Sequence, residues 1–466
     1  MAKNLVYDIH DRPKFTQMLI FAVQQLLAIL AATIAVPAIV GNGMSASAAL
    51  FGAGVGTVVY QLFTKFRSPV FLGSSFAFIG PMLAAFAGAT SAKLGFFGLV
   101  IGAVFAGLVY VVIALVVKYV GVGWINKIMP AAVIGPTVAL IGLSLAGAAV
   151  KDVFSYGETV THGLNQYFDM SANIWISLIC ALVTLATVIV CSVYGKKMVK
   201  LIPFIIGILT GYAVALIFTV IGYIADAEAL KIIDFGPFKA LVDGGVDFNT
   251  FIDLPDFVFV DAFKGIKDFE ASYLATIAVA YIPVAFVVFA EHLADHKNLS
   301  SIIGKDLLED PGLDNTLLGD GIGSMAGAFF GGCPNTTYGE SVGCVAITRN
   351  ASVATITTTA IMAALVAFIS PFVAFLDSIP GCVMGGVCIT LYGYIAVSGL
   401  KMIQKVDLEK SANLFTVSVI LITGIGGMAM AIGKVYITTT ACALVLGILT
   451  NFLLNKFKKN DSEDEE

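Results

Sequence analysis

The chain has 466 residues, of which 58% are hydrophobic and 12% charged, and its mean hydropathy is +0.94. Soluble domains carry roughly a quarter of their residues as charged side chains, so a soluble fold could not bury this much apolar surface. We therefore expect a protein whose solvent is the lipid bilayer. The net charge of −5 gives no reason to expect a nucleic-acid partner.

Residues 1–16 are polar and run directly into an apolar segment, without the pattern of a cleavable signal peptide. The seven cysteines fall almost entirely within apolar runs and form no CxxC or Cys/His pattern. We interpret them as small core residues rather than as a disulfide or metal framework. They are Cys180, Cys191, Cys333, Cys344, Cys382, Cys388 and Cys442.

Apolar segments long enough to cross a bilayer, which takes roughly 17–25 helical residues, recur along the chain. The clear ones are 17–40, 46–64, 94–117, 130–150, 172–194, 201–223, 271–291, 351–376, 382–400, 414–432 and 436–454. Three weaker ones, 70–87, 317–331 and 334–348, are short or broken by Gly, Ser and Pro. Counting all of them, we predict an all-α polytopic membrane protein with 14 transmembrane segments.

Positive charge supports this count. Of the 26 Lys and Arg residues, 19 fall on the side of the N-terminus and 7 on the other, and four of those 7 lie in the long loop 224–269. Positive charge marks the cytoplasmic side, and long loops count for little. We therefore place both termini, 1–16 and 456–466, in the cytoplasm and expect the final KKNDSEDEE to be disordered.

Two of the weak segments carry the strongest functional signal. SPVFLGSSFAFIGP (68–81) and GGCPNTTYGES (331–341) would each fall in the third span of a seven-span half, entering from opposite sides. Backbone groups freed where such spans break can bind a polar solute, and matched broken spans point to a transport site. Phe76, Phe78 and Tyr338 favour an extended backbone there. For either segment alone, close helix packing through glycine is the alternative.

Acidic residues at predicted membrane depth narrow the site. Glu291 and Asp295 stand four residues apart and share a helix face, and two such carboxylates resist double ionisation, as a proton carrier requires. Glu340 lies in the second broken segment. Carboxylates facing freed backbone N–H groups suit a small, planar, amide-like solute. The alternative is that the helix ends near Ala290 and that AEHLADHK is a wetted helix end.

Other polar residues of this region are interpreted as structural. We expect His292 and His296 to be interfacial. Arg349 is expected to anchor the cytoplasmic end of its span, and Asp320 to cap or bridge helices. No His/Cys cluster indicates a metal, and no nucleophile–base pair indicates an enzyme.

Four stretches carry a family resemblance: QQLLAILAATIAVP (24–37), SPVFLGSSFAFIGP, AEHLADH (290–296) and PNTTYGESVGCVAITR (334–349). They resemble the signatures of the nucleobase:cation symporter-2, or nucleobase–ascorbate transporter, family, closest to its bacterial uracil-transporting members. The resemblance covers nearly the whole chain. It implies two inverted seven-span repeats, with short antiparallel strands in spans 3 and 10.

The resemblance also implies a division into domains. A core domain of spans 1–4 and 8–11 would move against a gate domain of spans 5–7 and 12–14, with 224–269 as an extracellular loop. The core would comprise residues 17–117 and 270–376, and the gate 118–223 and 377–455. A homodimer in the plasma membrane, driven by the proton gradient and without a cofactor, is implied as well, and Na⁺ coupling stays open.

By position, the resemblance implies that Glu291 and Glu340 bind the nucleobase. It places the backbone at Ala32, Phe76 and Gly339 along the pocket.

Tyr338 and Ser75 would lie beside these groups, and Glu291 with Asp295 would carry the proton. Two positions depart from the uracil pattern. Asp295 stands where uracil carriers have His and purine carriers often have Asp, and Ser341 replaces the usual Asn. Uracil is the expected substrate, with xanthine or uric acid as the alternative. An anion carrier of similar layout is disfavoured, because an anion would not be bound beside a buried Glu.

Overall fold

The computed structural model describes residues 5–121, 124, 129–155, 159–162, 165–170, 172–196, 198–432 and 435–461. Lys3, Lys127, Lys197 and Lys434, which count toward the charge asymmetry, and the end of the tail, 462–466, lie outside the described residues.

The first half contains, in chain order, α1 (Phe15–Val40), α2 (Ala46–Phe63), β1 (Leu72–Ser74), η1 (Phe76–Phe78), α3 (Ile79–Ala87), α4 (Ala92–Val120), α6 (Ala131–Ser144), α7 (Ala146–Val153), β2 (Thr159–His162), β3 (Asn165–Phe168), α8 (Ala172–Tyr194), α9 (Met198–Leu201) and α10 (Pro203–Ile224). The second half contains η2 (Glu228–Leu230), α11 (Gly236–Ala240), α12 (Val258–Gly265), η3 (Ile266–Asp268), α13 (Ala271–Ile303), η4 (Leu308–Gly312), α14 (Leu313–Gly331), β4 (Asn335–Thr337), α15 (Gly339–Thr348), α16 (Val353–Val366), α17 (Ser370–Asp377), α18 (Gly381–Ile403), α19 (Ser411–Ile425), β5 (Met430–Ile432), β6 (Val435–Ile437) and α20 (Thr439–Asp461).

Nine helical segments of the described residues are long and apolar enough to cross a membrane, consistent with a polytopic protein. They are α1, α2, α4, α6 with α7, α8, α10, α13, α18 and α20. Their outward surfaces expose large apolar side chains such as Val112, Leu182 and Ile217. Such a surface would be unfavourable in water and is suited to lipid. All seven cysteines are free and buried, as predicted.

Several segments differ from the sequence-based prediction. Residues 351–376 form two helices, α16 and α17, because the chain turns at Ile369, which pairs with Ile252, and Pro371 opens the next helix. In 414–432 the helix ends at Ile425, since Gly427, with φ of +73°, lets the chain turn into the β5–β6 hairpin. The weak predicted span 317–331, in contrast, lies within α14, which is one continuous helix.

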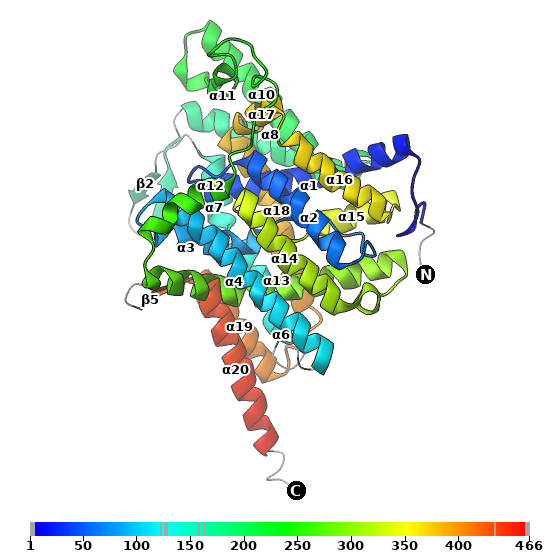
Figure 1. Cartoon of the computed structure of the whole chain (residues 1–466). Coiled ribbons are helices and arrows are strands. Elements are labelled where there is room, and N and C mark those ends of the chain that lie inside the picture. The colour runs from blue at the N-terminus through cyan, green and yellow to red at the C-terminus, as the bar shows by residue number, and fades with distance from the viewer. Residues whose placement is uncertain are drawn as a thin grey trace.

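The C-terminal helix also differs from the prediction. α20 runs to Asp461 and extends from the rest of the molecule (Figure 1), so the first residues of the predicted disordered tail are helical. The two Lys residues that open this tail are good helix formers, and the apolar helix before them provides the nucleus from which it extends.

The helices pack in two groups. The first contains α1, α2, α3, α4, α13, α14, α15 and α16, and in it α14 lies between α2 and α4 (Figure 1). The second contains α6, α7, α8, α10, α18, α19 and α20, with α18 packed on α6, α7 and α8. α13 contacts both groups, because it also reaches α6, α20 and β6.

Glycine permits the tightest helix contacts in both groups. A Cβ at Gly52 of α2 would lie 2.4 Å from the Gly327 carbonyl oxygen of α14. In the other group, a Cβ at Gly399 of α18 would lie 2.5 Å from the Gly135 carbonyl oxygen of α6. Small residues allow helix backbones to approach this closely in membrane proteins.

Segments that the sequence places on one side of the membrane lie together. The Val6 amide donates to the Arg349 carbonyl at 2.8 Å, and Lys305 pairs with Asp8 at 2.6 Å. Arg349, with φ of +56°, ends α15, and its backbone rather than its guanidinium makes this contact. The N-terminal segment is thus fixed to the loops that follow α13 and α15.

Candidate functional site

The two broken segments meet as a pair of antiparallel strands inside the first helix group. β1 pairs with β4 in the register Leu72 with Thr337, Gly73 with Thr336 and Ser74 with Asn335. The Ser75 amide extends the contact by donating to the Pro334 carbonyl at 2.9 Å. Strand pairing satisfies backbone groups that a broken helix leaves free, so the break is stable at this depth.

Tyr338 fastens one broken segment to the other. Its hydroxyl donates to the Ser74 carbonyl at 2.7 Å, and the side chain is 4% exposed. A Cβ at Gly73 would lie 2.3 Å from the Tyr338 ring, so only glycine leaves room for it. The Tyr338 ring therefore lies directly against β1.

Each strand leads into a short helix. β1 continues through η1, which starts at Phe76, into α3, and β4 continues through Tyr338 into α15, whose second residue is Glu340. The first N–H groups of a helix have no partner within it and carry partial positive charge. The antiparallel pairing thus brings two helix N-termini with free donors into one region.

Four of the predicted binding residues are at least partly exposed within this otherwise buried region. Gly339 is exposed, and a Cβ there would meet nothing within 4 Å. Phe76, Glu291 and Glu340 are partly exposed, whereas Ser75 is buried. The Phe76 ring also contacts Tyr392 of α18, at 5.9 Å between centroids, so this space adjoins the second helix group.

Glu291 and Asp295 lie on α13, facing β4. The Asp295 carboxylate accepts a hydrogen bond from the Thr337 hydroxyl at 2.7 Å. Glu291, Asp295 and Glu340 lie close enough to interact electrostatically. The structure therefore brings together the three carboxylates that the sequence singled out. Thr337 lies within the quoted motif, but its contact with α13 could not be read from the sequence.

The interfacial interpretation of His292 and His296 is wrong, because both imidazoles are fully buried. The Nδ1 atom of His292 lies 2.7 Å from the Asp320 carboxylate of α14, and the Nε2 atom of His296 lies 2.8 Å from the Tyr60 hydroxyl of α2. α13 continues to Ile303, so this face packs on core helices and is not a wetted end. Asp320 bridges two helices, as predicted.

Ala32 lies buried within α1, which is continuous through this residue. Its peptide groups therefore take part in the hydrogen bonds of the helix. Pro37 has no N–H, so the Thr33 carbonyl lacks the donor that it would otherwise have within the helix. Gln25, on the same helix, donates to the Ser341 hydroxyl of α15. A buried Gln in an apolar helix is a signal that the sequence analysis overlooked.

A pocket of about 630 Å³ opens between the two helix groups, beside the Glu291 and Asp295 face of α13. This volume falls within the roughly 300–1,000 Å³ typical of small-molecule sites. α13 contributes Ala290, Ala294 and Lys297, and α6 and α18 complete the lining. Glu291, Asp295 and Glu340 are not among the residues that line it.

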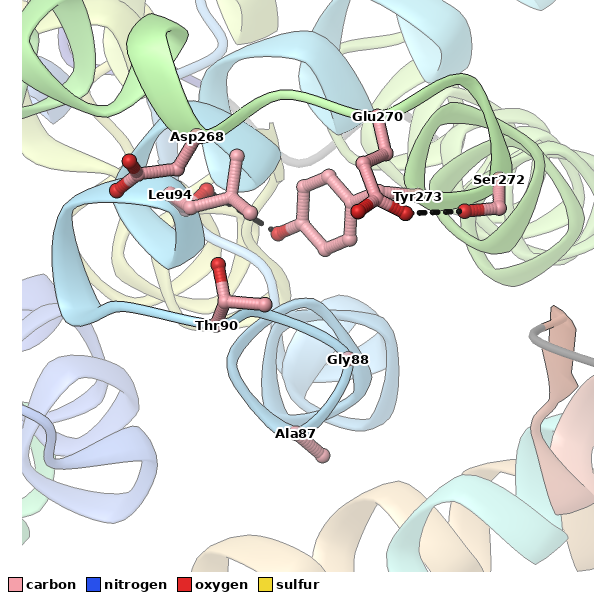
Figure 2. A pocket seen from close by; sticks show the side chains of 8 residues that line it. All are labelled: Ala87, Gly88, Thr90, Leu94, Asp268, Glu270, Ser272 and Tyr273. Atoms are coloured by element: carbon pink, nitrogen blue, oxygen red, sulfur yellow. Dashed lines mark hydrogen bonds between the residues drawn. The ribbon is translucent and has the colours of Figure 1, made fainter.

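A second pocket, of about 220 Å³, lies at the opposite end of α13 and contains none of the predicted binding residues. Figure 2 shows that the Tyr273 hydroxyl points toward Leu94, whose carbonyl it reaches at 3.2 Å, and that the Ser272 hydroxyl donates to Glu270 at 3.3 Å. Asp268 accepts from Ser91 at 2.8 Å. Its acidic groups thus already have partners, and we assign no ligand to it.

A family model described as Permease family, Xan_ur_permease, matches residues 16–433. This chain belongs to the nucleobase–ascorbate transporter family. Among the curated members, it is similar to the uracil permease of Bacillus caldolyticus, with 38% identity over 470 residues and 98% of each chain covered. The uracil permease of Bacillus subtilis is 35% identical, covering 100% of this chain and 98% of the relative, and that of Escherichia coli K12 is 34% identical, covering 94% and 92%.

Solved structures show the same fold at low sequence identity. The transmembrane domain of the cyanobacterial bicarbonate transporter BicA matches with a TM-score of 0.58 and 14% identity, covering 95% of this chain and all of that one. SLC26A9 matches with a TM-score of 0.61 and 12% identity, covering 96% of this chain and 66% of that one. This member of the nucleobase–ascorbate transporter family is therefore a multi-pass membrane transporter and not an enzyme.

Proposed function

We propose that this protein imports uracil together with protons across the plasma membrane by alternating access. The observation that carries the proposal is the convergence of Glu291 and Glu340 on accessible space beside two helix N-termini. The uracil permeases of Bacillus caldolyticus and Bacillus subtilis cover nearly the whole chain, which supports uracil as the substrate.

Uracil presents ring N–H groups and carbonyl oxygens in one plane. The carboxylates of Glu291 and Glu340 would accept the ring N–H groups through charge-assisted hydrogen bonds. The free amides near Phe76 and Gly339 would donate to the carbonyl oxygens. Tyr338 and Ser75 would support the pocket from behind, and the peptide groups near Ala32 would close it from α1.

Proton coupling is assigned to Glu291 and Asp295. They share one face of α13, and two carboxylates this close resist simultaneous ionisation. The pair therefore keeps one proton more readily than it loses both. The Thr337 hydroxyl on Asp295 links that proton to the strand that precedes Glu340. A proton from the outside would thus favour binding, and its release inside would favour uracil release.

We assign the first helix group to the proposed core domain and the second to the proposed gate domain. The five predicted spans that are not long apolar helices contain α3, α14, α15, α16 and α19, and we include them to reach 14 crossings in two inverted repeats. Two close helix contacts through glycine, α2 with α14 and α6 with α18, fall at matching positions of these repeats. Both termini are placed in the cytoplasm, and a homodimer is proposed.

A purine carrier is the second candidate, because Asp295 and Ser341 depart from the pattern of uracil carriers. Ser341 is held by Gln25 from α1, so this substitution changes the contacts of the helix that carries Glu340. An anion carrier, as the structural relatives could suggest, is not favoured. The carboxylates of Glu291 and Glu340 would repel an anion at the site.

Uptake of labelled uracil into cells that lack their own carrier tests the proposal. Excess unlabelled xanthine or uric acid is added in parallel, and each condition is repeated with a protonophore. We expect uptake that collapses with the protonophore and is unaffected by the purines. Strong competition by xanthine, or no uracil uptake, would transfer the assignment to a purine carrier.

A further inference from the structure

The pocket between the two helix groups is lined by positive charge that the proposed transport site does not use. Its lysines are Lys297 of α13, Lys401 of α18, and Lys405, which follows the end of α18. All of them are exposed. Within the described part of the chain, no Asp or Glu lines the pocket and no carboxylate forms a salt bridge with these lysines.

Other lysines on the predicted cytoplasmic side have carboxylate partners. Lys410 lies 3.4 Å from Asp407, and Lys305 lies 2.6 Å from Asp8. The pocket lysines instead surround one concave space without a carboxylate in its lining. Like charges gathered around a cleft attract a counter-ion into it, so the pocket is suited to an anion.

The rest of the lining is suited to an organic molecule rather than to a bare ion. Met129, Leu293 and Met402 give it apolar walls, and Asn298 and Ser398 add uncharged hydrogen-bonding groups. The pocket holds about 630 Å³, whereas one water molecule takes up roughly 30 Å³, so a small inorganic anion would leave most of it unfilled. An anion that also carries a flat, partly apolar body would cover both parts of the lining.

We infer that this pocket binds an organic phosphate from the cytoplasm, a nucleoside monophosphate. Lysine ammonium groups bind phosphate oxygens through charge-assisted hydrogen bonds. The base and ribose would lie on the methionine and leucine side chains, within reach of Asn298 and Ser398. Uracil itself is uncharged at neutral pH, so the lysines would recognise a phosphate that the proposed substrate lacks.

An occupant of this pocket would touch both helix groups. Lys297 belongs to the first group, whereas Lys401 belongs to the second, so movement of one group against the other must change the shape of the space between them. A bound nucleotide would fix that shape and slow the return of the carrier to the outside. A cell uses a nucleobase in the form of its nucleotide, so the nucleotide would reduce import once the imported base has been used. This regulatory part rests on the proposed function, whereas nucleotide binding itself does not.

The test measures binding of labelled uridine 5′-monophosphate to the purified full-length protein, without uracil, in nanodiscs of neutral phosphatidylcholine. We expect saturable binding that is about tenfold tighter than that of inorganic phosphate or of uridine, and that weakens as salt is added. No saturable binding, or equal affinity for inorganic phosphate, would overturn the inference. Loss of nucleotide binding when the nanodiscs contain phosphatidylglycerol would assign the pocket to a lipid headgroup instead.

Variants then locate the site. Lys297→Gln and Lys401→Gln should each weaken nucleotide binding about fivefold, because each removes one exposed charge, and Lys297→Arg should retain it. Lys118→Gln is the matched control, since Lys118 is an exposed lysine in the last turn of α4 outside the pocket, and it should bind the nucleotide normally. Wild-type affinity in both pocket variants would overturn the assignment.

Two further measurements separate this pocket from the proposed uracil site. Glu340→Ala should bind the nucleotide normally although it should lose uracil, and loss of nucleotide binding in this variant would place the nucleotide in the uracil site and overturn the inference. Proteoliposomes loaded with uridine 5′-monophosphate should take up labelled uracil more slowly than vesicles loaded with uridine. Equal rates would overturn the regulatory role. Because nucleotide binding is measured without uracil, its failure is distinguishable from a failure of uracil transport.

Discussion

The bond between Thr337 and Asp295 provides the sharpest test of how the site is assembled. It joins β4 to α13 at 2.7 Å, next to the two carboxylates proposed to bind uracil. A hydrogen bond to a charged group contributes about 1.5–3 kcal/mol. In Thr337→Val the side chain keeps its shape and loses this bond.

The loss should reduce the fraction of molecules in which β4 lies against α13, and the apparent affinity falls with that fraction. Since about 1.4 kcal/mol corresponds to a factor of ten, we expect the Kd for uracil to rise roughly 10–100-fold. Binding of labelled uracil to purified protein measures it, with Tm recorded to confirm folding.

Two variants control for the substitution. Thr337→Ser keeps the hydroxyl and should bind uracil nearly as the wild type does. Thr358→Val removes a hydroxyl that donates to the Ala354 carbonyl of its own helix, α16, and should have little effect. If Thr337→Val bound uracil with wild-type affinity, the contact between β4 and α13 would have no part in assembling the site.

Three further predictions concern the supporting structure. Gly73→Ala places a Cβ 2.3 Å from the Tyr338 ring and should greatly reduce uracil uptake at normal surface expression; normal uptake would show that Tyr338 can move freely. Gly52→Ala places a Cβ 2.4 Å from the Gly327 carbonyl oxygen and should lower the free energy of unfolding by about 1–3 kcal/mol. The control Gly147→Ala places its Cβ in open space and should be neutral or stabilising. Equal Tm values for the two variants would contradict the close packing of α2 on α14. The Lys305 ammonium holds the pKa of Asp8 below its ordinary value, so its stabilising contribution is present at neutral pH and is lost as the pH falls through that lowered pKa. The amide protection factors of residues 5–11, which correct for the intrinsic effect of pH on exchange, should then fall in acid, and Asp8→Asn should lower them at neutral pH and remove this pH dependence.

Much of the site could be predicted from local sequence. The Gly, Ser and Pro residues in 68–81 and 331–341 mark the breaks because they interrupt apolar helices at membrane depth. Glu291, Asp295 and Glu340 stand out because a carboxylate in an apolar membrane segment is energetically costly and is usually functional. These signals are local, and they required no knowledge of which helices are neighbours.

The remaining features depend on contacts between distant segments. His292 and His296 look interfacial in sequence because Lys297 follows them, yet α2 and α14 bury them. The pocket between the two helix groups arises only where α13 meets α6 and α18. The helix break at Ile369 depends on its pairing with Ile252, more than a hundred residues earlier.

Direct binding of uracil to the purified protein tests the central claim most closely. Wild type, Glu340→Ala and Glu291→Ala are compared with Glu309→Ala, which removes an exposed carboxylate outside the proposed site. We expect the wild type and Glu309→Ala to bind uracil alike, and both site variants to lose binding while remaining folded. Uracil binding of wild-type affinity by Glu340→Ala would contradict the account.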